Sequence, residues 1–151
     1  MADVISTGEA FSSTDALREV WPVTAEVAVG TALIALDGKK AGVAYTNSGG
    51  HTRSDAYSQA PATLTGIPDG GVGLAALECS VACDGSYEFA VAGATNTGQA
   101  QNGTDVYAIV TAGRITGLTL TVGSNVLWGT INNPKQYNPG AAGIACVKIG
   151  G

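Results

Sequence analysis

The sequence predicts a single all-β domain, an antiparallel β-sandwich or β-barrel with an extended N-terminal arm. Three observations lead to this prediction. The chain has 151 residues, a length typical of one domain. Gly, Thr, Val and Ala dominate and only 13% of the residues are charged, which favours strands over helices. Short apolar runs are separated by turn residues about every 8 to 12 positions, as in β-sandwiches and β-barrels.

The most regular segment is residues 105–131, which contains the runs DVYAIVT, RITGLTLTV and NVLWGTI. The runs are rich in β-branched and aromatic residues, and turn sequences separate them at Ala112-Gly113 and Gly123-Ser124-Asn125. This pattern predicts three strands of an antiparallel meander. Alternation within the first run places three residues on one face, Val106, Ala108 and Val110.

Further strands are expected on both sides of this segment, for a total of about eight to ten. An Asp37-Gly38 turn predicts a hairpin between two early strands. The other strand-like runs are ATLTGI, Val72 to Cys83, YEFAVAG and AGIACVKIGG. Polar, weakly periodic residues predict loops at 47–61, 93–104 and 132–140.

The first 22 residues are polar and weakly patterned, and we expect them to form an arm. Thr14 or Asp15 would cap a short helix that runs through Arg18 and Glu19, and a proline at position 22 would end it. Trp21 is costly to leave in water, which indicates that the arm docks on another surface. The expected division is an arm at 1–22 and a β-domain at 23–151.

Charge and hydropathy limit the kinds of partner. The net charge is −5, and the seven Lys and Arg residues are scattered along the sequence. A nucleic-acid groove needs a clustered basic patch, so nucleic acid is not an expected partner. No run of 18 apolar residues occurs, and the N-terminus lacks the basic and apolar regions of a signal peptide. The sequence therefore predicts no membrane partner either.

Candidate chemistry is sparse. His51 is the single histidine and lies in the polar loop with Arg53 and Asp55. A Ser-His-Asp arrangement with Ser48 or Ser54 can be written on paper, but nothing in the sequence fixes its geometry. We therefore expect no catalytic residues and no enzyme activity.

The three cysteines, Cys79, Cys83 and Cys146, are expected to be buried free thiols. Their number is odd, and the chain has no export signal, so reduced thiols are the expected state. Together with His51 they would supply four zinc ligands, but the spacing matches no zinc motif. No metal or other cofactor is predicted.

Four motifs, in order and spacing, resemble a family of small phage proteins. The first is VAVGTALIALDGKKAGVAYTN at 27–47, and GSYEFAV follows at 85–91. The third is GTDVYAIVTAGRIT at 103–116, and the last is IACVKIG at 144–150. Together with a polar N-terminal arm, this order is similar to the capsid cement, or head-decoration, proteins. The sequence departs from the family pattern in its longer polar loop and in Trp128, where the pattern has a smaller residue.

The resemblance implies a structural protein of the virion, made in the host bacterial cytoplasm. Such a protein binds the outer surface of the expanded phage head and bridges neighbouring subunits of the major capsid protein. It acts as a homo-oligomer, more often a trimer than a dimer. Small binding energies would be multiplied over many identical sites.

Apolar and aromatic residues are the candidates for these contacts, because such residues dominate interface energetics. For capsid binding we predict residues of the arm, Phe11, Leu17, Val20 and Trp21. For the oligomer interface we predict aromatic residues expected in loops, Tyr45, Trp128 and Tyr137. The alternatives are another virion component, such as a head-fibre base or tail protein, and a carbohydrate-binding β-sandwich. The latter would need an aromatic platform, and only 6% of the residues are aromatic.

Overall fold

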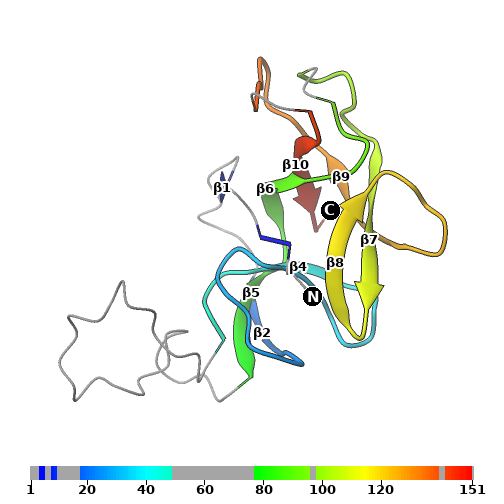
Figure 1. Cartoon of the computed structure of the whole chain (residues 1–151). Helices are drawn as coiled ribbons and strands as arrows, with labels where there is room; N and C mark the ends of the chain where they lie inside the picture. The colour runs from blue at the N-terminus through cyan, green and yellow to red at the C-terminus, as the bar shows by residue number, and fades with distance from the viewer. Residues whose placement is uncertain are drawn as a thin grey trace.

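A computed structural model describes residues 4–5, 8–9, 18–48, 77–95, 98–139 and 142–150 (Figure 1). All the regular structure in these residues is β-strand, so the predicted all-β class is confirmed. The described residues contain no helix long and apolar enough to cross a membrane. The strands form two sheets whose neighbouring strands run antiparallel.

The larger sheet has six strands in the order β1-β6-β10-β9-β7-β8. Their bounds are β1 Gly8–Glu9, β6 Gly85–Ala90, β7 Asp105–Thr111, β8 Arg114–Thr119, β9 Val126–Ile131 and β10 Ile144–Ile149. In Figure 1 the β7–β8 hairpin lies on one side, next to β9 and β10. The sheet curls, because Ala92 just beyond β6 reaches β8 and forms a parallel bridge with Thr119.

The smaller sheet has four strands in the order β2-β5-β4-β3. Their bounds are β2 Arg18–Pro22, β3 Ala32–Ile34, β4 Ala41–Ala44 and β5 Glu78–Ala82. The β3–β4 pair is the hairpin that the Asp37-Gly38 turn predicted. Gly38 has a φ of 72°, a left-handed conformation that favours glycine.

The main core lies between the two sheets, and alternation along each strand decides which residues enter it. The small sheet contributes Ala32, Ile34, Val43 and Ala82. The large sheet contributes a larger set that includes Tyr87, Phe89, Val106, Ala108, Ile115, Leu118, Trp128, Ile131, Ala145, Val147 and Ile149. A second cluster covers the other face of the small sheet and consists of Trp21, Val27, Leu33, Ala44, Cys79, Val81 and Cys83. The small sheet is therefore buried on both faces.

The strands predicted over residues 105–131 are confirmed, but their order is not that of a meander. β9 lies beside β7 instead of β8, so the sheet order is β9-β7-β8. The outer side of β8 is partly taken by Ala92, which bonds through its backbone to Leu118 and Leu120. The face of β7 predicted to hold Val106, Ala108 and Val110 is also interrupted before Val110. A register shift after Ile109 leaves Val110 36% exposed, although Val106 and Ala108 are buried as expected.

A β-bulge decides the position of Trp128. Val106 pairs with Gly129 and the next residue, Tyr107, pairs with Leu127, so Trp128 is the extra residue of β9. The bulge turns the indole into the main core, where it is 4% exposed and meets Phe89 edge-to-face at a centroid distance of 5.4 Å. The expectation that Trp128 lies at an oligomer interface is therefore corrected, because the side chain has almost no surface left for a partner.

The predicted arm is, in its described parts, an edge of both sheets. The expected helix through Arg18 and Glu19 is wrong, because both residues lie in β2, which pairs with β5. Further upstream, β1 pairs with β6, and the Val4 carbonyl accepts a hydrogen bond from the Ala32 amide at 2.7 Å. The N-terminal strands therefore extend both sheets and form one edge of each.

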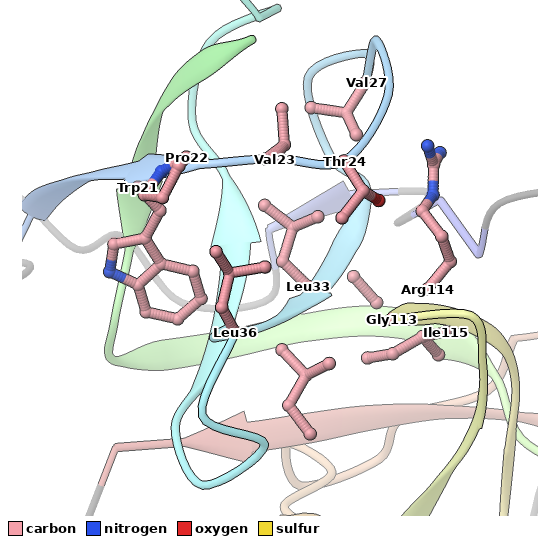
Figure 2. A pocket seen from close by; sticks show the side chains of 12 residues that line it. Trp21, Pro22, Val23, Thr24, Val27, Leu33, Leu36, Gly113, Arg114 and Ile115 are labelled. Atoms are coloured by element: carbon pink, nitrogen blue, oxygen red, sulfur yellow. The ribbon is translucent and has the colours of Figure 1, made fainter.

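A small cavity marks the place where the two sheets meet near the β7–β8 turn. Its volume is about 20 Å³, close to the space one water needs. Figure 2 shows its lining side chains, which come from β2 and the loop after it, from β3 and the turn after it, and from the hairpin. Ala112 and Gly113 at this turn both have positive φ, 52° and 77°, as a two-residue hairpin turn requires.

Two loops at one end of the large sheet are joined by the side-chain amides of Asn102 and Asn133, of which that of Asn133 is buried. Asn133 is 2% exposed, and its side chain accepts from the Cys146 amide and donates to the Gly98 carbonyl, both at 2.8 Å. The Asn102 side chain donates to the Asn133 carbonyl at 3.0 Å and accepts from the Asn133 amide at 2.8 Å. These bonds fix the segment after β9 against β10.

Candidate interaction surface

The four residues predicted to bind a capsid do not form one surface. Val20 is 57% exposed on edge strand β2 and remains available to a partner. Trp21 is 7% exposed and packs in the second cluster, so the expectation that it docks elsewhere is corrected. Its indole N–H donates to the Glu19 carboxylate at 2.8 Å. Phe11 and Leu17 lie outside the described residues.

The three residues predicted for the oligomer interface also lie apart. Tyr45 is 44% exposed just after β4, and the Arg18 guanidinium lies 3.6 Å from its ring centroid. Tyr137 is half-buried in the loop after β9, where its hydroxyl donates to the Glu88 carboxylate. Trp128 is in the core. Of these three, only Tyr45 presents a largely exposed ring.

The structure instead brings together an apolar row that the sequence interpretation did not select. Tyr107 and Leu127 are paired across β7 and β9, and Ile109 follows on the same face of β7. Leu127 is 58% exposed and Ile109 is 38% exposed, with its terminal carbon placed over Gly117 of β8. We call Tyr107, Ile109 and Leu127 the outer row. The only signal in the sequence was that neither face of the first run carries strong charge.

A basic hollow adjoins the outer row and shares Leu127 with it. Its volume is about 430 Å³, and three lysines line it, Lys39, Lys40 and Lys148. They come from the β3–β4 turn and from β10, so the hollow lies where the two sheets meet. We call this site the lysine pocket. An apolar row beside charged groups is the usual arrangement of a protein-binding surface.

One lysine of the pocket is held in place by an ion pair. The Lys40 ammonium contacts the Glu19 carboxylate, whose other oxygen accepts the indole N–H of Trp21. The hydrogen bond from Lys40 lowers the pKa of Glu19, and the same bond raises the pKa of Lys40. In the part of the chain that the structure describes, no carboxylate lies within ion-pair distance of Lys39 or Lys148.

The buried thiols and one phenol are held neutral. All three cysteines are free and buried, as predicted, and burial raises the pKa of each thiol. Burial and the hydrogen bond to Glu88 raise the pKa of Tyr137 above its ordinary value. A thiol with a raised pKa is a poor nucleophile, so these cysteines are structural groups.

These raised pKa values predict a loss of stability in alkali. The unfolded chain releases protons near pH 8.5 from thiols and near pH 10 from tyrosine, whereas the folded chain retains them to higher pH. The stabilisation is fully present below about pH 8 and falls as the pH rises above that value. Urea midpoints measured between about pH 7 and pH 11 should show this fall. Tyr137→Phe should have a shallower fall above about pH 10, and an unchanged slope would contradict the assignment.

The described residues contain no group of three or more His, Cys, Asp or Glu that could hold a metal ion. Ser48, one of the serines considered for a triad, is fully buried, and its hydroxyl accepts a hydrogen bond from the Val27 amide at 3.0 Å. His51, Arg53, Ser54 and Asp55 lie outside the described residues. No family model, curated protein or solved structure matches the chain.

Proposed function

We propose that this chain is a structural, non-enzymatic protein of a phage virion. It binds the outer surface of the capsid and stabilises the expanded head by bridging neighbouring subunits of the major capsid protein. The observation that carries the proposal is the outer row, an exposed apolar strip on an all-β domain. Exposed apolar residues that are contiguous and rimmed by charge are typical of protein-binding sites. The order of motifs from residue 27 to residue 150 supports the identity of the partner.

The geometry suits a clamp between protein subunits. Ile109 and Leu127 project from neighbouring strands of one sheet, so the contact is held on rigid elements. The two sheets are joined through a common core, so the domain would transmit load between the subunits it contacts. Each copy needs only modest affinity, because a head offers many identical sites.

Binding to expanded heads should depend on the outer row. The double variant Ile109→Asp and Leu127→Asp places two charges in the apolar contact, and we expect it to bind about 100-fold more weakly than the wild type. Co-sedimentation with expanded, DNA-free heads of the phage that encodes the chain measures this. Saturable binding by the wild type supports the proposal, whereas a wild-type chain that ignores heads and binds tails contradicts it.

Two matched variants locate the contact. Val29→Asp introduces the same charge at a residue that is 55% exposed but belongs to the segment between β2 and β3 and not to the outer row, and it should bind as the wild type does. Val20→Asp tests the predicted contribution of β2. If Val20→Asp weakens binding and the double variant does not, the contact lies on the small sheet and the outer row is not the capsid-binding surface.

The proposed oligomer is a trimer rather than a dimer. Light scattering coupled to size exclusion gives the molar mass of the free protein. A discrete trimer, or a monomer that forms trimers only on heads, agrees with the proposal. A chain that remains monomeric on saturated heads contradicts the proposed oligomer while leaving capsid binding intact.

A further inference from the structure

The lysine pocket concentrates the positive charge of an acidic chain. The protein has four lysines, Lys39, Lys40, Lys135 and Lys148, and three of them line a single hollow. The chain as a whole carries a net charge of −5. A basic hollow in an acidic protein attracts an anionic group more strongly than the surrounding surface does.

The pocket retains positive charge after its internal contacts are counted. Lys40 is paired with Glu19, and Asp105 also lines the hollow. Lys39 and Lys148 are exposed and have no carboxylate partner in the described part of the chain. Among the described residues, two ammonium groups are therefore available at the hollow, one from the β3–β4 turn and one from β10.

Gly129 lines the pocket at a point where β9 packs closely on β10. A Cβ at Gly129 would lie 2.5 Å from the Lys148 carbonyl oxygen and 2.8 Å from a Val147 methyl carbon, so no side chain fits there. The β9 bulge turns Trp128 towards the core, and Leu127 forms an exposed apolar wall. The hollow thus combines two ammonium groups, which have no carboxylate partner among the described residues, with an apolar side that continues into the outer row.

We propose that the lysine pocket binds a carboxylate side chain of an extended protein segment in which an acidic and an apolar residue stand two positions apart and therefore lie on the same face. The carboxylate lies between Lys39 and Lys148, and a neighbouring apolar side chain contacts Leu127. Nucleic acid fits less well, because two free lysines cannot neutralise a run of phosphates and the rest of the chain is acidic. This inference rests on the proposed function, since it names the chemistry of the partner at that interface.

A peptide titration tests the pocket without heads, so its failure is distinct from a failure of capsid binding. The probe is acetyl-Leu-Glu-Glu-Leu-amide, added to isotope-labelled full-length protein and followed by amide NMR shifts. We expect shifts at Lys39, Lys148 and Leu127, and a loss of binding at high salt. The neutral peptide acetyl-Leu-Gln-Gln-Leu-amide should bind at least threefold more weakly, because it lacks the carboxylate and a typical exposed ion pair contributes about that much to affinity. Equal binding by both peptides would overturn the proposal.

The lysines provide a matched control within the chain. The double variant Lys39→Gln and Lys148→Gln should bind the acidic peptide about tenfold more weakly, whereas Lys135→Gln, outside the pocket, should bind it as the wild type does. Unchanged amide dispersion shows that each variant is folded.

Inorganic phosphate is the third probe. If phosphate binds the pocket as tightly as the peptide does, the site is an anion site and not a segment-binding one. An equal loss in Lys135→Gln would also refute the assignment.

Discussion

Replacing Trp128 with alanine is expected to destabilise the domain by about 3–5 kcal/mol, a large part of the 5–15 kcal/mol typical of a folded domain. The indole fills the main core, packs edge-to-face on Phe89 and donates to the Leu33 carbonyl at 2.8 Å. That hydrogen bond joins β9 of the large sheet to β3 of the small sheet. The variant therefore loses both a core side chain and a link between the sheets. Urea unfolding at neutral pH measures the effect.

Phenylalanine variants of the two tryptophans separate the contribution of the indole hydrogen bond to stability from that of the ring. Both rings are buried, but the N–H of Trp128 bonds to a buried carbonyl, whereas that of Trp21 bonds to the partly exposed Glu19 carboxylate. Trp128→Phe should cost about 1–3 kcal/mol, because it removes a buried hydrogen bond between the sheets and part of the core volume. Trp21→Phe should cost less, since water can reach Glu19. An equal cost for the two variants would show that the link between the sheets contributes little.

Asn133→Ala is expected to cost about 2–4 kcal/mol. Its side chain accepts a hydrogen bond from the Cys146 amide and donates one to the Gly98 carbonyl, and the side chain is buried at 2% exposure. Removing the amide leaves a donor and an acceptor without partners near the edge of β10. The free energy of unfolding from urea titration is the appropriate measurement.

The matched control is Asn125→Ala. The Asn125 side chain also donates to a backbone carbonyl, that of Thr121, but the bond is exposed to solvent. Water replaces it, so the control should cost less than about 1 kcal/mol. Similar losses in both variants would mean that the buried position of Asn133 does not decide its contribution.

The strands could be predicted from the sequence because local signals define them. The turn at Ala112-Gly113 and the break around Gly123 divide residues 105–131, and the structure places β7, β8 and β9 within these runs. The closing strand and the early hairpin follow the same turn chemistry. The three cysteines could be predicted as buried free thiols because free cysteine behaves as a small apolar residue and their number is odd.

The pairing of strands could not be predicted in the same way. Whether β9 lies beside β8 or β7 depends on contacts made by Ala92, which is distant in sequence. The bulge at Trp128 reverses the alternation of β9, so a residue that local pattern leaves free for a surface enters the core. The helix expected near Arg18 failed for a related reason, since pairing with β5 overrides weak local helix signals.

The lysine pocket and the outer row could not be predicted from local sequence patterns either. Lys39 and Lys40 precede β4, whereas Lys148 lies near the end of β10, and only the meeting of the two sheets brings them to one hollow. The same charges look scattered when they are read along the chain. The outer row depends on the register between β7 and β9, which a sequence does not specify once a bulge intervenes.

The central position of β10 in the large sheet affects the order in which this protein is synthesised and folds. Ile144–Ile149 lies between β6 and β9, so the two parts of the large sheet remain separate until β10 has left the ribosome. Before then, β6 and β9 each present an open edge, and the chain is exposed to misassembly with its neighbours. The large sheet can therefore be completed only after β10 has been synthesised. Slow growth at low temperature should for this reason raise the yield of correctly folded protein.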